Sequence, residues 1–87
     1  MQTSKQIRDS LISFLKDDPF YRETLPSVFS DDFNLVNAGV LDSIGILNLI
    51  VFLEAHFNIS ISIDELSEEN FLNVEKIVKY IELKIQN

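Results

Sequence analysis

The sequence predicts an all-α fold, a four-helix bundle with three longer helices, one short helix and a long loop between helices one and two. The chain has 87 residues, of which 46% are hydrophobic, so it has the length and composition of a single folded domain over residues 1–87. Apolar residues recur at helical spacing in three segments. A fourth segment alternates as a strand does, but it has no second strand to pair with.

The first helix is expected over residues 4–16, which carry apolar side chains three and four positions apart. This stripe consists of Ile7, Leu11, Phe14 and Leu15. Thr3 or Ser4 is suited to cap the start of the helix. The acidic pair before Pro19 ends it, because proline cannot continue a helix.

The connection over residues 18–42 holds both prolines and one of the two glycines. A structureless loop of this length is unusual in a compact domain, so we expect it to be functional or to hold a short helical turn. Five apolar residues are expected to attach it to the core: Val28, Phe29, Phe33, Leu35 and Val40.

The second helix is expected over residues 43–57, with Asp42 as its N-cap and Asn58 as its stop. Ten of these 15 positions are apolar, and they form two stripes where a bundle helix needs only one. The core stripe consists of Ile46, Ile50, Leu53 and Phe57. The second stripe consists of Ile44, Leu47 and Val51. Either the long loop covers the second stripe or the stripe is an exposed patch for a partner.

Residues 59–63 are expected to form an extended link. Ser62 and Glu65 have the spacing of a capping box, which predicts a short helix that ends near Ser67. Asn73 is suited to cap the last helix. The apolar stripe of that helix consists of Val74, Ile77, Val78, Ile81 and Ile85.

Composition narrows the classes of function. Seven basic and 14 acidic residues give a net charge of −7, which disfavours nucleic acids and anionic membranes as partners. The absence of cysteine excludes thiol catalysis and Cys-based metal sites. No segment has the length of a membrane span or the apolar core of a signal peptide, so we expect a cytoplasmic protein, monomeric by default.

His56 fits an ordinary position near a helix C-terminus. We expect that the chain has no catalytic residue, binds no metal and is not an enzyme in its own right.

Ser43 is one of nine serines, and by itself it is an ordinary residue for a helix start. It follows a turn at residues 38–41 and the capping Asp42, and it heads the helix that carries the second apolar stripe. A phosphate-bearing group esterified at Ser43 would be exposed, and the helix N-terminus would favour its negative charge.

Two segments carry a specific resemblance to a known family. Residues 39–44, Gly-Val-Leu-Asp-Ser-Ile, are similar to the G-x-x-D-S-[LIM] signature of the acyl and peptidyl carrier proteins. Residues 54–61, Glu-Ala-His-Phe-Asn-Ile-Ser-Ile, are similar to the E-x-x-F-x-I-x-I segment of the same family. The resemblance extends from Ile7 to Ile85 and includes Glu65-Leu66, Asn70-Phe71, Ile77 and Tyr80-Ile81.

The resemblance implies roles for the expected second helix and for its cap. Ser43 would receive phosphopantetheine from coenzyme A by the action of a phosphopantetheinyl transferase, and the thiol of that group would carry an acyl or aminoacyl group as a thioester. Asp42 would cap the helix and help to present Ser43. Ile44, Leu47 and Val51 would form the docking surface for partners. The chain would be a covalent substrate shuttle and not an enzyme.

The cargo class depends on a departure from the family pattern. Fatty-acid carriers place several acids along this helix, whereas the comparable positions here are Gly45, Asn48 and Ala55, and Glu54 is the only acid between Ser43 and Phe57. This favours a stand-alone aminoacyl or peptidyl carrier, as in nonribosomal peptide biosynthesis, and a D-alanine carrier is one such possibility. Its expected partners are an adenylating loading enzyme and downstream oxidase, condensing or transferase enzymes. The alternatives are an acyl carrier of fatty-acid or polyketide synthesis and an unmodified helical interaction module.

Overall fold

The computed structural model describes residues 3–86, and these residues form helices and loops without any strand. The long helices are α1 (Ser4–Asp17), α3 (Ser43–Phe57) and α5 (Val74–Gln86). The short elements are α2 (Pro19–Arg22), the 3-10 helix η1 (Ile63–Glu65) and α4 (Glu68–Phe71). The predicted all-α fold with three longer helices and a long loop is confirmed.

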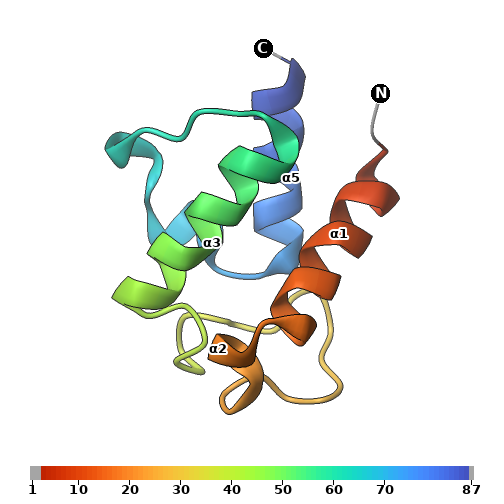
Figure 1. The fold of residues 1–87 in the computed structure, drawn as a ribbon, viewed down its shortest axis with the longest axis vertical. Coiled ribbons are helices and arrows are strands. Elements are labelled where there is room, and N and C mark those ends of the chain that lie inside the picture. Colours follow the sequence, from red (N-terminus) through yellow and green to blue (C-terminus); the bar gives the residue numbers. More distant parts are fainter. Residues whose placement is uncertain (1–2, 87) are drawn as a thin grey trace.

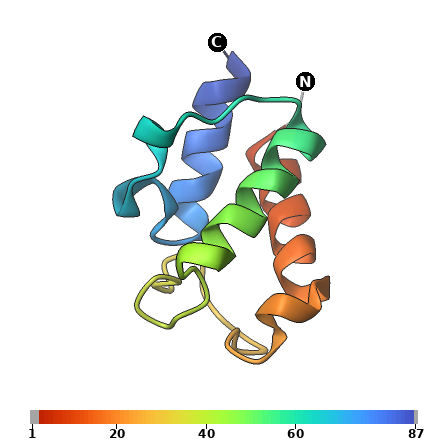
Figure 2. The same cartoon turned by 60° about the vertical axis from the view of Figure 1, so that its left-hand side comes forward.

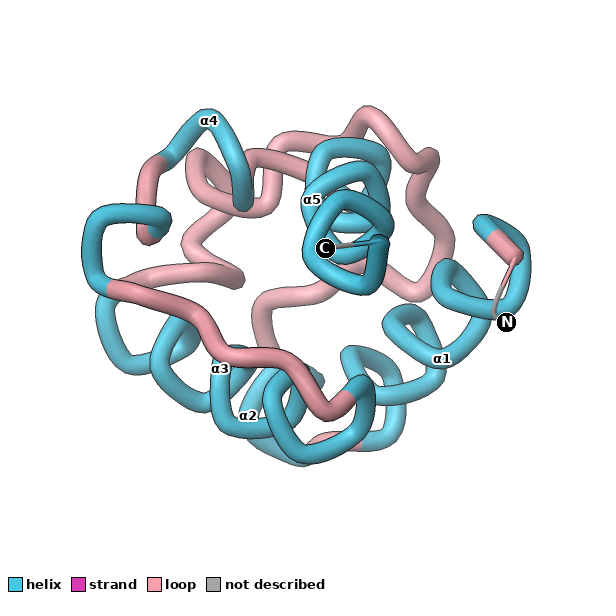
Figure 3. Tube along the Cα trace, turned by 90° about the horizontal axis from the view of Figure 1, so that it is seen from above, coloured by secondary structure: helices cyan, strands magenta, loops and turns pink. Residues whose placement is uncertain are grey.

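The three long helices surround the core (Figure 1). Helices α1 and α5 pack directly on each other, and α3 completes the bundle, as the turned view also shows (Figure 2). The loop that precedes α3 closes the lower end of the bundle. The linker that follows α3 runs along the upper end to η1 (Figure 3). None of the helices within residues 3–86 combines the length and the apolar character that crossing a membrane requires.

The core consists of hydrophobic side chains from all three long helices and from the loops. It contains Ile7, Leu11, Leu15, Tyr21, Leu35, Val40, Leu41, Leu49, Ile50, Leu53, Phe57, Phe71, Val74, Ile77, Val78, Tyr80 and Ile81. The stripes predicted for the first and last helices are therefore confirmed, with Phe14 and Ile85 partly buried at their edges. Full burial of a leucine or isoleucine contributes about 1.5–3 kcal/mol, so this cluster is the main source of stability.

Local hydrogen bonds set the helix boundaries. Thr3 caps α1 in a capping box, in which its hydroxyl accepts from the Gln6 N–H at 3.2 Å and its own N–H donates to the Gln6 side chain at 2.9 Å. Asp18 ends α1 and caps α2, where its side chain accepts from the Phe20 N–H at 2.8 Å. Asn58 ends α3 in the left-handed conformation, with φ of 55°. Asn73 accepts from the Lys76 N–H at 2.8 Å and starts α5.

The long loop holds the expected helical turn, which is α2. Leu35 and Val40 are buried, and Phe29 and Phe33 are partly buried. The prediction for Val28 is wrong, because this side chain is 88% exposed. Val28 lies in a bend of the loop, and the next residue, Phe29, is the one that packs against the core.

The segment after α3 differs in part from the prediction. Residues 59–62 form an extended link, and Ser62 and Glu65 form the expected capping box. However, the helix that this box starts ends at Glu65 and does not reach Ser67. Ser67 instead caps a separate turn, α4, because its side chain accepts from the Asn70 N–H at 3.3 Å. This second turn brings Phe71 into the core.

Candidate functional site

The second apolar stripe of α3 lies on the surface. Ile44 is 65% exposed, Leu47 58% and Val51 67%. We call these three residues the apolar face. The long loop does not cover it, so the interpretation in which the loop buries this stripe is wrong, and the stripe is an exposed patch. Leu49 lies outside both predicted stripes and is nevertheless buried, as is Gly45, so α3 has a wider buried side than its core stripe indicated.

Asp42 caps α3 directly before Ser43. Its side-chain Oδ1 accepts from the Gly45 N–H at 2.7 Å, and its backbone carbonyl accepts from the Ile46 N–H at 2.8 Å. Ser43 is exposed and occupies the first position of the helix. The first N–H groups of a helix have no partner within it, and they give this end a partial positive charge. The Ser43 hydroxyl thus lies at an accessible, electropositive end.

A hydrogen-bonded turn holds the residues that precede Asp42. The Leu35 carbonyl accepts from the N–H groups of Val40 and Leu41 at 3.0 and 3.1 Å. Gly39 has a φ of 79°, which glycine adopts without the strain that other residues meet. Val40 and Leu41 are also buried, so the segment that leads into α3 is fixed to the core.

Gly45 allows a close approach between this turn and α3. A Cβ atom at Gly45 would lie 2.6 Å from the carbonyl oxygen of Val40, far inside van der Waals contact. The buried Tyr21 also holds this residue, because it donates its hydroxyl hydrogen to the Gly45 carbonyl at 2.6 Å. Burial raises the pKa of Tyr21 to about 12, so the phenol keeps its proton. The sequence pattern gave no sign of either contact.

Comparison with known proteins identifies the family. A family model for the phosphopantetheine attachment site matches residues 22–81, which is more than half of the chain. This chain belongs to the phosphopantetheine-attachment family. The resemblance to carrier proteins is confirmed, and the protein is a phosphopantetheine-bearing carrier that tethers an intermediate as a thioester.

Curated relatives are similar to the carrier over most of its length. They include the D-alanyl carrier proteins of Streptococcus pyogenes serotype M5 (strain Manfredo), serotype M49 (strain NZ131) and serotype M1. Each is 40% identical over 65 residues, which span 75% of this chain and 80% of the relative. Carriers of this family are in general not catalysts, and they work with a phosphopantetheinyl transferase and with loading enzymes.

The residues at the start of α3 fit a covalently bound phosphate. An exposed hydroxyl is the group needed for a phosphodiester, and the electropositive helix end favours the negative charge of that ester. Helix α3 itself brings no acidic side chain to its first turn. Within residues 3–86, no group of three or more His, Cys, Asp or Glu side chains is placed to hold a metal ion.

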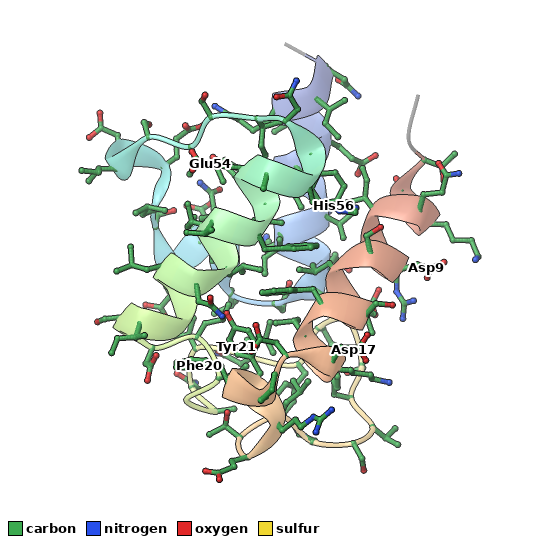
Figure 4. The ribbon with its side chains drawn as sticks, in the orientation of Figure 1. Asp9, Asp17, Phe20, Tyr21, Glu54 and His56 are labelled. Carbon is green, nitrogen blue, oxygen red and sulfur yellow. The ribbon has the colours of Figure 1, made fainter. Side chains whose placement is uncertain are left out.

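The two titratable residues in the second half of α3, Glu54 and His56, lie toward the upper end of the bundle (Figure 4). Glu54 accepts from the Ile61 N–H at 2.9 Å, so the only acid of α3 binds the linker that follows the helix. His56 is exposed and stacks on Phe52, with ring centroids 5.0 Å apart. Its position near the helix C-terminus agrees with the sequence interpretation.

Proposed function

We propose that Ser43 is the residue to which phosphopantetheine is attached, and that the carrier holds an aminoacyl cargo, with D-alanine the first candidate. The observation that carries this proposal is the exposed Ser43 hydroxyl at the capped N-terminus of α3, inside the region that matches the family. The apolar face begins at the next residue, so an enzyme that reaches Ser43 also meets an unpaired hydrophobic surface.

The proposed modification is a phosphoryl transfer to Ser43. Its Oγ attacks the phosphorus of coenzyme A that bears pantetheine, the new Oγ–P bond forms, and the bond to the second phosphate breaks. Adenosine 3′,5′-bisphosphate leaves, and a base of the transferase takes the hydroxyl proton. The attached group supplies a thiol, which this cysteine-free chain lacks.

The chain's own residues present the serine and catalyse nothing. Asp42 fixes the first turn of α3, and the apolar face of Ile44, Leu47 and Val51 binds successive partners. Tethering raises the effective concentration of the cargo for each enzyme that docks. The carrier therefore needs an exposed serine and a docking surface, but no catalytic side chain.

The cargo proposal rests on the named relatives and on the charge of α3. The relatives are D-alanyl carrier proteins. Glu54, the only acid of α3, accepts a hydrogen bond from the Ile61 N–H. We propose that an adenylating ligase loads D-alanine and that a downstream transferase removes it. The proposed modification and loading consume coenzyme A and ATP, and this supports a cytoplasmic location for the carrier.

Intact mass tests the attachment site. The carrier is incubated with coenzyme A and a phosphopantetheinyl transferase of broad specificity, beside Ser43→Ala and Ser60→Ala. Ser60 is also an exposed serine and serves as the matched control. We expect the mass of one phosphopantetheine on the wild type and on Ser60→Ala, and none on Ser43→Ala. A gain on Ser43→Ala would refute the assignment, as would a folded wild type that no transferase modifies.

Loading of the modified carrier tests the cargo. The carrier is incubated with ATP, an adenylating ligase encoded in the same genome, and either D-alanine or L-alanine. We expect a hydroxylamine-sensitive mass gain of one alanyl group with the D-isomer. Loading by a malonyl transferase from malonyl-coenzyme A, without aminoacylation, would instead identify an acyl carrier.

A further inference from the structure

Phe20 is an aromatic residue left partly in solvent beside the start of α3. Its side chain is 46% exposed, whereas the next residue, Tyr21, is completely buried. Both belong to the one-turn helix α2, which lies under the first turns of α3 (Figures 1 and 4). Phe20 is one of the few large hydrophobic residues that the fold leaves exposed, and it lies next to the turn that presents Ser43.

Gly45 brings the Phe20 ring close to α3. The Cε1 atom of Phe20 lies 3.5 Å from the place where a Cβ atom of Gly45 would be. The ring also packs edge-on against Tyr21, with centroids 5.2 Å apart. The ring is therefore held against the helix and is not a freely rotating surface side chain.

Three hydrogen bonds fix α2 to α3 and thereby place Phe20. Tyr21 donates to the Gly45 carbonyl at 2.6 Å. The Asn48 side chain donates to Asp18 Oδ2 at 3.3 Å and to the Tyr21 hydroxyl oxygen at 3.4 Å. Asp18 also caps α2 through the Phe20 N–H. This polar network joins α2 and the first two turns of α3 into one unit.

The unit extends the apolar face toward α2. Ile44 and Asn48 are neighbours on α3, four positions apart, and Asn48 contacts Tyr21 of α2 directly. Phe20 lies against Gly45, the residue after Ile44, while Asn48 binds the Asp18 carboxylate and the Tyr21 hydroxyl beside it. The extended surface carries three apolar side chains near Ser43, from Phe20, Ile44 and Leu47, each about half exposed or more.

We propose that Phe20 is a contact residue for the phosphopantetheinyl transferase, which receives the ring in an apolar socket. This inference rests on the proposed attachment at Ser43. An enzyme that brings its active site to the Ser43 hydroxyl covers the first turn of α3, and Phe20 lies against that turn. Its burial in the complex removes an apolar ring from water, which favours binding. The Tyr21–Gly45–Asn48 network is the positioning element for this contact.

Steady-state kinetics of the transferase test the contact. The variant is Phe20→Ala, and the matched control is Leu83→Ala, because Leu83 is 61% exposed on α5. We expect Phe20→Ala to raise the KM for the carrier about tenfold with kcat unchanged, at a temperature where both proteins are folded, which corresponds to the loss of one buried aromatic contact. We expect Leu83→Ala to change neither constant. Equal KM values for the two variants would overturn the proposal.

Two further measurements keep the proposal falsifiable. A photoreactive benzoylphenylalanine at position 20 is expected to crosslink to the transferase, and one at position 83 is not. This arm needs no stable alanine variant, and absence of the crosslink at position 20 would overturn the contact. At saturating enzyme, Phe20→Ala must still gain one phosphopantetheine. If the wild type gains no mass, the proposed attachment at Ser43 is refuted. If the wild type is modified but the KM of Phe20→Ala is unchanged, only the Phe20 contact is refuted.

Discussion

The Oδ1 atom of Asp42 accepts a hydrogen bond from the Gly45 N–H at 2.7 Å, and the same oxygen lies 3.1 Å from the place that a Cβ atom of Gly45 would occupy. The cap and the glycine therefore depend on each other. Asp42 satisfies an N–H group of the first turn, and the missing side chain at Gly45 lets the preceding turn approach the helix. Ser43 lies between these two residues, so its position is set by both.

Replacement of Asp42 by alanine should weaken the start of α3. We expect the free energy of unfolding to fall by about 1 kcal/mol, because alanine cannot accept from the Gly45 N–H. Asp42→Asn keeps an acceptor of similar shape and should retain most of the stability. Urea unfolding of the three proteins measures the difference. Equal losses in both variants would assign the effect to the carboxylate charge instead of the acceptor, and no loss in Asp42→Ala would show that the cap contributes nothing.

Gly45→Ala should destabilise the carrier, which is the reverse of the usual effect in a helix. Glycine in a helix interior is about 1 kcal/mol less favourable than alanine, so this replacement alone would stabilise α3. Here the added Cβ would lie 2.6 Å from the Val40 carbonyl oxygen, and the turn before Ser43 would have to shift. Thermal unfolding measures the sign. Ser13→Ala, on the exposed side of α1, is the control and should change Tm little.

Glu65 should make the stability depend on pH in the acid range. Hydrogen bonds from the Ser62 N–H and then from Lys84 lower the pKa of Glu65 to about 2. The ordinary value is 4.5, so the folded protein holds this carboxylate ionised where the unfolded chain protonates it. Its contribution is complete above pH 4.5 and is lost as the pH falls toward 2.

Urea unfolding of the wild type and of Glu65→Gln at several pH values checks this dependence. The wild type should be the more stable protein near neutrality, and the difference should shrink between pH 4.5 and 2. A constant difference over this range would assign the effect of the substitution to packing instead of charge.

Leu53→Ala should test whether the buried side of α3 holds the bundle together. Leu53 is completely buried, and leucine-to-alanine replacements in cores cost about 2–5 kcal/mol. For a domain of this size that is a large part of the total stability. Chemical denaturation provides the value, and Leu83→Ala on the exposed side of α5 should stay within about 0.5 kcal/mol of the wild type. Similar losses in both would contradict the assignment of the core.

The sequence predicted those parts of the fold that depend on local patterns. The three long helices follow from apolar spacing. Asp42 and Asn73 mark helix starts through bonds to residues at most four positions away, and Asn58 marks a helix end through its left-handed conformation. Ser43 was found by the same means, as the residue after a cap. The family resemblance then gave it a role that local geometry alone did not.

Contacts between distant segments were not visible in the sequence. Tyr21 reaches Gly45 across 24 positions, and no spacing rule identifies such a pair. Leu49 is buried beside Leu53, four positions further along α3, so the buried side of this helix is wider than the predicted stripe. Val28 was misplaced for a different reason, since a hydrophobic residue in a loop has no period to tell which side it faces. The pattern does not predict the second short helix, because Ser67 fits the end of one turn and also caps the next one.

The contact between Ser4 and Glu82, whose side chains are 2.6 Å apart, has a consequence for protein engineering. It joins the beginning of α1 to the last turns of α5, at the opposite end of the bundle from the start of α3 (Figure 1). Linkers attached before α1 and after α5 would therefore leave the bundle at one end, and Ser43 lies at the opposite end. A circular permutant with a short bridge between these ends and new termini in the exposed stretch around Val28 should keep the site intact.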